Sequence, residues 1–272
     1  MKTFFKLADA LFPSMAAKQV YKVMSNPRVR KLRAFEEEIL AKAVKERIAY
    51  KNGEIQLYKW GNSTDKTIFL VHGWEGQAGN FGGLIDILLK KKYYVVAFDA
   101  PSHGRSTKRS TNMFEFVELV TKLVKTHQPA SIISHSFGSV TTLMVLSNLR
   151  EMSIEQWFVV TTPHNFKDRI NDVKQFLGVT ERTIDKVIYQ FESDTGYKLD
   201  NLNVDYYGDK VPHVKEVVIV HSKSDKILPI DSARFAHKAI PHSELIELDD
   251  LGHYAILWSD ALKEVLKTRL KE

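Results

Sequence analysis

Ser131-Ile132-Ile133-Ser134-His135-Ser136-Phe137-Gly138-Ser139 is the stretch that decides the fold of this chain. An apolar strand runs into a turn of small residues, and a helical stretch (140–149) follows at once. In such a corner, commonly written G-x-S-x-G, the central serine adopts a positive φ that lifts its hydroxyl clear of strand and helix. The residues two before and two after it must then be small, which Gly138 meets fully and Ser134 less well. The pattern predicts Ser136 as a nucleophile, with a serine-rich helix N-cap as the alternative interpretation.

The same corner offers a hydrogen-bond donor. Phe137 stands at the start of the predicted helix, where a backbone N–H has no acceptor within the helix and favours negative charge. One corner could therefore supply a nucleophile and one donor of an oxyanion hole.

Composition limits the class of protein. The chain has 272 residues, of which 44% are hydrophobic, enough for one large domain or a domain with an extension. It has no cysteine, so disulfides, iron–sulfur clusters and thiolate zinc sites are excluded. No apolar run approaches the roughly 20 residues of a membrane span. Because Lys6, Asp9 and Pro13 interrupt the N-terminal apolar stretch, we identify no secretory signal and expect a cytoplasmic protein.

The net charge of +6 lies in the N-terminal segment. Residues 1–47 contain 11 Lys or Arg and 5 Asp or Glu, whereas the remainder contains 28 of each kind. A nucleic-acid-binding protein would have a basic face on its folded domain. We therefore expect no nucleic-acid partner.

Residues 1–45 are predicted to form an N-terminal helical extension of two helices that break near Asn26-Pro27. Apolar residues recur at helical spacing in both halves. Three interpretations stay open at this point: an arm packed on the domain, a basic amphipathic surface that contacts anionic membrane, and an arm that binds a partner.

From residue 46 onward strands and helices alternate. Two alternating runs joined at Asn52-Gly53 predict a hairpin over 47–60, and the apolar run 67–71 predicts a strand buried on both faces. Further strands are expected at 94–98, 132–133, 157–160, 217–220 and 245–248, with helices near 81–91, 113–127, 139–149, 232–239 and 254–270. This order indicates an α/β fold with a mostly parallel central sheet and helices on both faces.

One stretch, at about 164–214, breaks this alternation. Its apolar residues recur at helical spacing, and it is far longer than a single crossover between strands. We expect a small helical cap inserted here into the domain formed by residues 46–272, lying over the C-terminal ends of the strands.

Residues that could bind a ligand or take part in catalysis follow most of the predicted strands. Ligands of open α/β sheets bind outside the C-terminal ends of the strands. In chain order the strand ends carry His72-Gly73-Trp74, then Asp99-Ala100-Pro101-Ser102-His103-Gly104-Arg105-Ser106, the Ser136 corner, the Asp225 loop, and Gly252-His253.

These five features, in this order, resemble the α/β-hydrolase superfamily in its capped, lipase/esterase-like form. The resemblance covers roughly residues 46–270. The order Ser…Asp…His is that of this fold's catalytic triad and not of other serine hydrolases. Ser134 departs from the family's usual glycine without removing a catalytic group, and the resemblance says little about residues 1–45.

Carried over residue by residue, the resemblance implies Ser136 as nucleophile, His253 as base and Asp225 as the acid that orients the imidazole. The N–H groups of Trp74 and Phe137 would form the oxyanion hole. No cofactor is implied, and the sequence has no H-x-x-x-H or H-x-H pair that would indicate a metal site.

Other residues compete for these roles. Asp249 and Asp250 are alternatives to Asp225, although each stands close in sequence to His253. Four further histidines follow strands, where in this fold they more often hydrogen-bond loops than act as a base; they are His72, His103, His135 and His221.

The activity implied is hydrolysis of a small-molecule carboxylic ester through an acyl-enzyme, as in carboxylesterases (EC 3.1.1). Thioesters, lactones and amides use the same triad, and the fold alone does not separate them. The alternatives are a non-catalytic binding protein with this fold and a membrane-surface lipid or thioester hydrolase that uses residues 1–45. Aromatic residues of the insertion could line an acyl pocket; they are Phe166, Phe176, Tyr189, Phe191, Tyr197, Tyr206 and Tyr207.

Overall fold

The computed structural model describes residues 2–28 and 31–271 and builds this part of the chain around an eight-stranded sheet. The strand order is β1-β2-β4-β3-β5-β6-β7-β8. β1 and β2 form the predicted antiparallel hairpin, β2 is antiparallel to β4, and the remaining pairs are parallel. The strands are β1 (Val44–Tyr50), β2 (Gly53–Trp60), β3 (Lys66–Val71), β4 (Tyr93–Asp99), β5 (Ser131–His135), β6 (Ile154–Val160), β7 (Val214–Ser222) and β8 (Ser243–Leu248).

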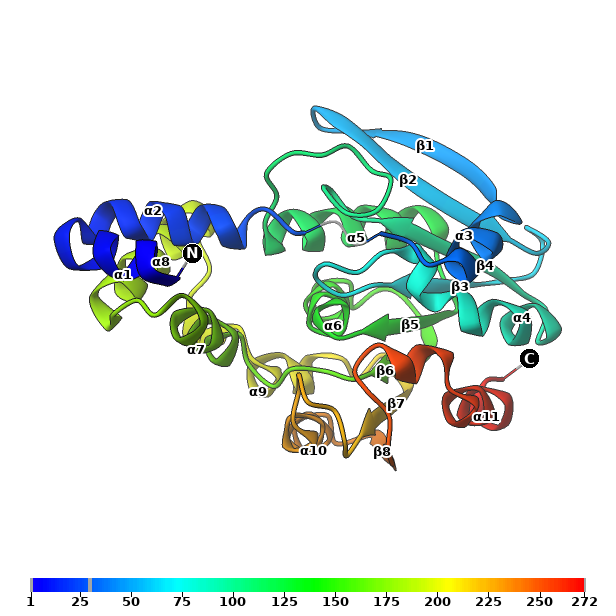
Figure 1. Ribbon diagram of the computed structural model, residues 1–272. Helices are drawn as coiled ribbons and strands as arrows, with labels where there is room; N and C mark the ends of the chain where they lie inside the picture. Colours follow the sequence, from blue (N-terminus) through cyan, green and yellow to red (C-terminus); the bar gives the residue numbers. More distant parts are fainter. Residues whose placement is uncertain (1, 29–30, 272) are drawn as a thin grey trace.

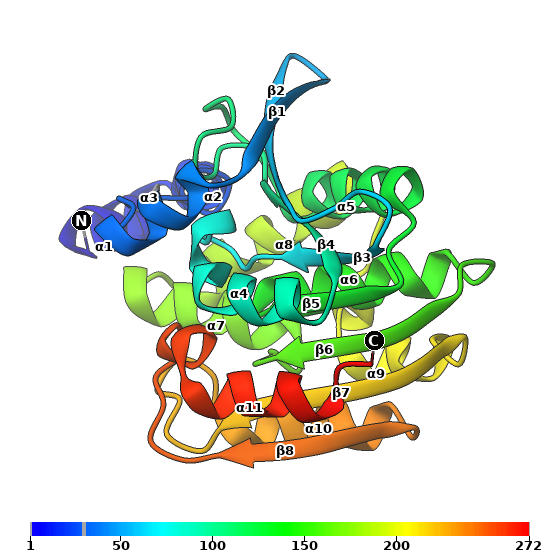
Figure 2. The same ribbon diagram turned by 90° about the vertical axis from the view of Figure 1, so that its right-hand side faces the viewer.

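Helices cover both faces of the sheet (Figures 1 and 2). α4 (Gly82–Lys90) and α11 (Asp260–Arg269) pack on one face. α5 (Met113–His127), α6 (Phe137–Asn148) and α10 (Ile230–Ala239) pack on the other. The predicted α/β fold, with a mostly parallel sheet between two helical layers, is therefore confirmed.

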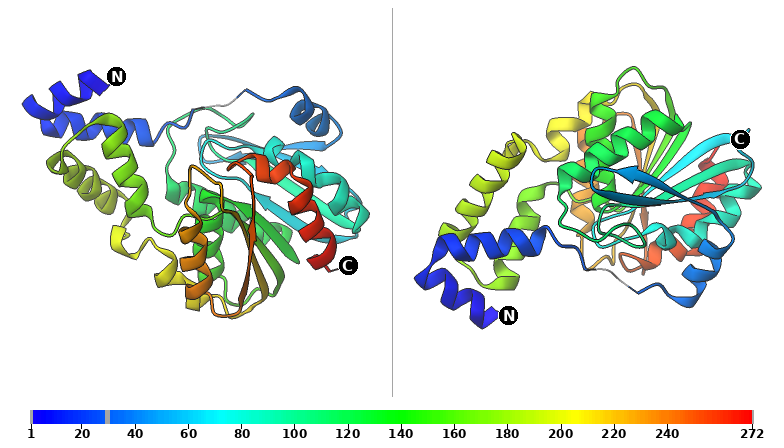
Figure 3. Two further views of the ribbon diagram at one scale, coloured as in Figure 1. Left: turned by 60° about the horizontal axis from the view of Figure 1, so that its bottom comes forward. Right: turned by 90° about the horizontal axis from the view of Figure 1, so that it is seen from above.

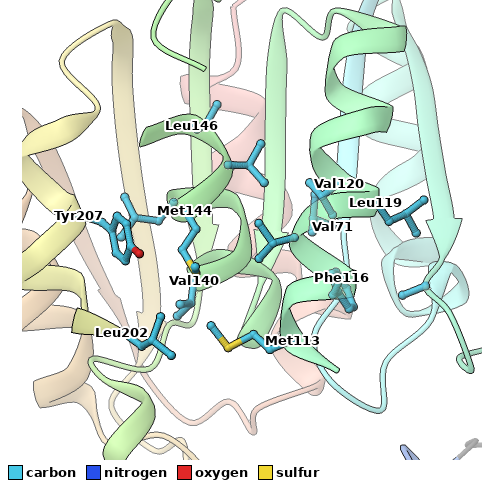
Figure 4. Packing of buried hydrophobic residues seen from close by; sticks show 14 of the residues in the cluster. Val71, Met113, Phe116, Leu119, Val120, Val140, Met144, Leu146, Leu202 and Tyr207 are labelled. Carbon is cyan, nitrogen blue, oxygen red and sulfur yellow. The ribbon is translucent and has the colours of Figure 1, made fainter. Parts of the chain in front are cut away.

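The strands are apolar on both faces because each face packs against helices. In β3, Ile68 and Leu70 belong to the core beneath α4 and α11, whereas Phe69 and Val71 belong to the core beneath α5 and α6. A slip of one residue would exchange the two faces, so the core fixes the register. Figure 4 shows the second core at close range, with Val71, Met113, Phe116, Val140 and Met144 among its labelled side chains.

The N-terminal extension differs from the predicted pair of helices. It forms α1 (Lys2–Leu11), α2 (Pro13–Met24) and α3 (Ala34–Ala41). Pro13 explains the additional break, because proline lacks an N–H and is tolerated in the first turn of a helix but not in its interior. β1 begins at Val44, which the sequence pattern assigns to a helix.

The last predicted helix, over 254–270, is also two elements. Residues 255–258 form a 3-10 turn, and α11 begins after Ser259. The Ser259 hydroxyl accepts the N–H of Leu262 at 3.1 Å and so caps a new helix.

The segment between β6 and β7 is helical, as predicted. It contains α7 (Phe166–Leu177), α8 (Glu181–Thr195) and α9 (Val204–Tyr207), with one 3-10 turn (Leu199–Asn201) between α8 and α9 and another (Gly208–Lys210) after α9. Asn165 caps α7 by accepting the N–H of Asp168 at 2.7 Å, and Gly178 ends it in the left-handed conformation with φ +71°.

α1 and α2 pack on this insertion. Figures 1 and 3 show α1, α2, α7 and α8 lying together to one side of the sheet and its covering helices. The buried Asp9 of α1 accepts hydrogen bonds from the N–H (3.1 Å) and the hydroxyl (2.9 Å) of Thr180, the residue before α8. The extension and the insertion also share one apolar core, which includes Phe5, Ala17, Val20, Ile184 and Val187.

We expect Asp9→Ala to loosen this four-helix layer. The change leaves the Thr180 N–H without its acceptor, and loss of such a cap or buried hydrogen bond costs about 1–3 kcal/mol. The variant should unfold at a lower temperature than the parent, and trypsin should cleave it faster after Lys18 and Lys22. Asp185→Ala, an exposed change on α8, is the matched control. Identical behaviour of the two variants would show that Asp9 does not hold α1 to the insertion.

Candidate active site

Ser136 occupies the strained corner between β5 and α6. Its backbone has φ +56° and ψ −124°, outside the regions that L-residues ordinarily adopt. Its N–H donates to the carbonyl oxygens of Val160 (3.1 Å) and Thr161 (3.0 Å) at the end of β6. The neighbouring strand therefore imposes the conformation that turns the Ser136 hydroxyl outward.

Close packing explains the glycine after the serine. A Cβ atom at Gly138 would lie 2.4 Å from the carbonyl oxygen of Val71 and 2.5 Å from that of His72. Real Cβ atoms do not approach backbone so closely, so the contact of α6 with the end of β3 requires glycine at this position.

The departure at Ser134 is accommodated by hydrogen bonds. The Ser134 hydroxyl accepts a bond from the Trp157 indole N–H at 2.8 Å and donates to the Ser139 hydroxyl at 3.1 Å. Ser139 in turn donates to the carbonyl oxygen of Thr161 at 3.1 Å. Because every member of this buried chain has a partner, a serine replaces the usual glycine without an unsatisfied polar group.

The structure brings Ser136, His253 and Asp225 together. The distance from His253 Nε2 to Ser136 Oγ is 3.0 Å, and that from His253 Nδ1 to Asp225 Oδ2 is 2.7 Å. These residues are far apart in sequence and follow β5, β8 and β7, so the meeting of parallel strand ends at one edge assembles them.

Asp225 is held as a buried carboxylate. Its Oδ1 accepts the N–H groups of Ile227 (2.8 Å) and Leu228 (3.0 Å). Burial opposes the charged form, but hydrogen bonds from His253 and from these N–H groups outweigh it and hold the pKa of Asp225 below its ordinary value. The carboxylate is thus ionised at neutral pH and fixes the orientation of the His253 ring.

The competing acids lie elsewhere. Asp249 is exposed and forms an ion pair with Lys223 at 2.6 Å, and Asp250 lies 3.4 Å from the Ser224 hydroxyl. Neither of them is hydrogen-bonded to His253 in the described part of the chain, whereas Asp225 is.

The loop after β3 borders the serine. A Cβ atom at Gly73 would lie 3.0 Å from Ser136 Cβ and 3.4 Å from its Oγ, so the backbone here runs directly beside the Ser136 side chain. Trp74 follows, and its ring is 5.6 Å from that of Phe137, the first residue of α6. Trp74 and Phe137, the two predicted oxyanion-hole residues, thus lie on the two elements that flank Ser136.

His72 and His103 support this region through their neutral forms. His72 Nδ1 donates to the carbonyl oxygen of Gly73 at 2.7 Å, and its Nε2 accepts the N–H of Ala100 at 3.0 Å. His103 is arranged alike, with Nδ1 donating to Pro101 (2.9 Å) and Nε2 accepting from Glu75 (3.1 Å). An added proton on Nε2 would break either accepted bond.

Burial agrees with these tautomers. It lowers the pKa of His72 to about 4, and burial together with the nearby His72 lowers the pKa of His103 to about 3. The resemblance implies that such histidines bind loops, but nothing in the sequence identifies the loop of Trp74 as the partner. The only signal is a place after a strand: His72 follows β3 directly, and His103 stands four residues beyond the end of β4.

His135 and His221, the other two histidines, hydrogen-bond backbone carbonyl oxygens at the site. His135 Nε2 donates to the carbonyl oxygen of His253 at 2.8 Å, and His221 Nε2 donates to that of Leu228 at 3.0 Å. The first bond holds the backbone of His253 itself, and the second holds Leu228, whose N–H is bonded to Asp225.

The aromatic residues of the insertion differ in burial, and Tyr197 and Tyr206 are 37% and 44% exposed. Phe191 and Tyr207 are buried and Phe166 packs on Phe191 at 5.6 Å, so these rings belong to the core. Phe176 and Tyr189 are 62% and 75% exposed and face solvent, which contradicts a role for these two in an enclosed acyl pocket.

A groove of about 580 Å³ lies beside α3, β2 and α4, away from Ser136, and is lined by Ile39, Lys42, Trp60, Asp86 and Tyr94 among others.

Within residues 2–28 and 31–271, no group of three His, Asp or Glu side chains lies close enough together to bind a metal ion. None of the helices in these ranges has the length and apolar character needed to cross a bilayer.

The chain belongs to the alpha/beta hydrolase family, whose model matches residues 68–268. The predicted α/β-hydrolase fold is thereby confirmed. A serine hydrolase-like protein of Homo sapiens is 27% identical over 148 residues, which are 52% of this chain and 71% of the human protein. A serine hydrolase-like protein of Danio rerio is 33% identical over 119 residues, 41% of this chain and 36% of that protein. The chain therefore spans only about a third of the latter.

A solved structure gives the same result at the level of the fold. The Pyrococcus furiosus esterase Pf2001 superposes with a TM-score of 0.65 at 20% identity, covering 91% of this chain and 96% of the esterase. At this identity the likeness concerns the fold. The family and its named relatives support hydrolase activity in the coarse sense, without specifying the bond that is cleaved.

The neutral histidines predict how stability depends on pH. In the unfolded chain His103 binds a proton below about 6.5, whereas in the folded protein its pKa is about 3. The unfolded state therefore gains protons first as the pH falls, and the free energy of unfolding should decrease from about pH 6.5 towards pH 4. His103→Gln keeps an acceptor for the Glu75 N–H and does not titrate, so its decrease between pH 7 and 4.5 should be smaller.

Urea unfolding at several pH values measures this difference. His242→Gln, at an exposed histidine, is the control and should retain the slope of the parent. If His103→Gln and His242→Gln have the same slope as the parent, His103 is not held neutral by the fold.

Proposed function

We propose that this protein is a serine hydrolase that cleaves a carboxylic ester, carboxylesterase-like (EC 3.1.1), through an acyl-enzyme formed on Ser136. The observation that supports this most strongly is the 3.0 Å contact between His253 Nε2 and the hydroxyl of a serine with φ +56°. A serine hydroxyl is a weak nucleophile at its free pKa and requires an adjacent base.

In the proposed mechanism His253 Nε2 accepts the Ser136 proton as Oγ attacks the ester carbonyl carbon. The imidazolium that forms is stabilised by Asp225, whose Oδ2 lies 2.7 Å from Nδ1. His253 then gives the proton to the leaving alcohol oxygen as the bond from that oxygen to the carbonyl carbon breaks, and the acyl group stays on Ser136. Water next attacks the acyl carbon and gives a proton to His253, which returns it to Ser136 Oγ as the bond to the acyl group breaks and the carboxylic acid is released.

The oxyanion of each tetrahedral intermediate would be bound by the N–H groups of Trp74 and Phe137. Both lie beside Ser136, and the Phe137 N–H is at a helix start, where partial positive charge gathers. Loss of one oxyanion-hole donor typically costs about 2.7–4 kcal/mol of activation free energy.

The insertion between β6 and β7 is the proposed cap. α7 contacts the loop of the acid, because Arg169 Nη1 donates to the carbonyl oxygen of Ile227 at 3.3 Å. A helical layer attached at this point favours a role in choosing the acyl or alcohol group. The alternative, a non-catalytic binding protein on the same fold, is disfavoured because the three triad side chains are all present and in contact.

Ser136→Ala should abolish hydrolysis of an activated ester such as p-nitrophenyl acetate and labelling by a fluorophosphonate. His253→Ala should lower turnover nearly as far, since triad residues act as a unit, and Asp225→Asn similarly or somewhat less. Asp249→Asn, which alters an exposed ion pair, is the matched control. Full labelling of Ser136→Ala would refute Ser136 as the nucleophile. Loss of activity in Asp249→Asn together with retained activity in Asp225→Asn would refute Asp225 as the acid.

A second candidate function is hydrolysis of lipid esters at an anionic membrane surface. The second half of α1 and the α1–α2 turn after it expose apolar side chains: Leu7 is 67% exposed, Leu11 63% and Phe12 59%. The sequence of the two helices contains four lysines and one acidic residue, Asp9, whose side chain is buried. Apolar side chains beside lysines are suited to the boundary between headgroups and acyl chains.

Co-sedimentation with vesicles tests this second function. The parent should bind phosphatidylglycerol vesicles more strongly than phosphatidylcholine vesicles, and less strongly as salt is added. The triple change Leu7→Ser, Leu11→Ser and Phe12→Ser should weaken binding about tenfold or more, because it removes the apolar contact. Val44→Ser, at a residue that is 70% exposed on β1, is the control. Equal binding by all three proteins would exclude the α1–α2 turn as a membrane contact.

A further inference from the structure

The oxyanion loop, which we define as residues 73–80, is bound at both ends by the N-terminal extension. The Glu75 carboxylate accepts three hydrogen bonds from Arg28, which lies between α2 and α3. These come from the Arg28 N–H (3.2 Å), Nε (2.8 Å) and Nη2 (3.0 Å). A guanidinium that binds both oxygens of a carboxylate fixes its orientation as well as its position.

The second end of the loop is bound by α3. Glu36 of α3 is 1% exposed, and its Oε1 accepts the Asn80 side-chain amide at 3.0 Å. Asn80 Oδ1 in turn accepts the N–H of Gln77 at 2.9 Å. Arg33 donates to both Glu36 oxygens through its N–H (2.8 Å) and its guanidinium (2.7 Å), so the carboxylate is well satisfied.

The backbone between these two anchors is strained where it carries Trp74. Glu75 has φ +57°, a left-handed conformation that non-glycine residues hold only under constraint. Its N–H donates to His103 at 3.1 Å, and Gly76 closes a turn with its N–H on the Gly73 carbonyl oxygen at 2.9 Å. The direction of the peptide N–H at Trp74 follows from this turn.

We propose that Arg28 is a positioning residue for the oxyanion hole, acting through Glu75 on the backbone N–H of Trp74. This proposal rests on the serine-hydrolase function proposed above. Arg28 touches no reacting atom in it: the guanidinium fixes the Glu75 side chain, and Glu75 holds the strained turn that aims the preceding N–H. A hydrogen-bond donor aimed at the tetrahedral intermediate acts on the transition state far more than on the bound ester.

Kinetics give the first test. Arg28→Ala should lower kcat for p-nitrophenyl acetate about tenfold, with KM changed less than twofold. It should weaken inhibition by phenylboronic acid, whose tetrahedral adduct on Ser136 resembles the intermediate, by a similar factor. Arg28→Lys, which retains one charged donor, should recover part of the loss. Lys31→Ala, at an exposed cation of the same linker, should leave all three values unchanged.

Thermal unfolding of Arg28→Ala, and its combination with Glu75→Ala, distinguish a positioning role of Arg28 from a purely structural one. The Arg28 side chain is 81% exposed, so Arg28→Ala should leave the midpoint of thermal unfolding close to that of the parent. Adding Arg28→Ala to Glu75→Ala should cause no further loss of kcat, because Arg28 acts through Glu75. A rise of KM at constant kcat, or an unchanged kcat, would overturn the proposal.

Hydrogen–deuterium exchange gives a readout that does not depend on catalysis. Peptides that cover 73–80 should exchange faster in Arg28→Ala than in the parent or in Lys31→Ala, because the amides of Glu75 and Gln77 lose protection. Unchanged exchange overturns the proposal. If the parent protein takes up no fluorophosphonate, the proposed function fails instead, and the exchange result still decides whether Arg28 fixes this loop.

Discussion

The positive φ of Ser136 is the constraint on which the rest of the site depends. It is maintained by two carbonyl oxygens at the end of β6, which both accept the Ser136 N–H. The outward hydroxyl then lies 3.0 Å from Nε2 of His253, which follows β8, and the backbone of Gly73 passes alongside. The neighbouring strand thus imposes the strained conformation of Ser136, and the glycine at position 138 and the place of His253 are the ones that this conformation requires.

The sequence alone predicts those features whose determining residues stand close together in the chain. The strands of the sheet, the corner at Ser136 and the histidine after β8 are each marked by apolar runs or small residues within a few positions. The sequence does not predict contacts between two segments that are far apart in the chain. Asp9 is an acidic residue on an amphipathic helix, which predicts a solvated position, yet it is buried against Thr180. Nothing near either residue in the sequence identifies the other as its partner.

The histidines illustrate the same limit at the site itself. Residue type and strand-end position made His72 and His103 alternatives to His253, and their chemistry alone does not separate the three. The difference is which atoms face each ring. His253 lies between a hydroxyl and a carboxylate, whereas Nε2 of His72 and of His103 accepts a backbone N–H. A ring whose lone pair is already used by a backbone amide cannot take the proton of a serine.

The N-terminal extension connects these observations, because one segment contacts both the insertion and the oxyanion loop. Asp9 is hydrogen-bonded to Thr180 before α8, and Arg28 of the linker after α2 is hydrogen-bonded to Glu75 in the turn that follows Trp74. The family match begins at residue 68, and the extension therefore lies outside it. The proposed nucleophile Ser136 and base His253 lie within the matched residues, whereas Arg28, which we propose to position the oxyanion loop, lies outside them.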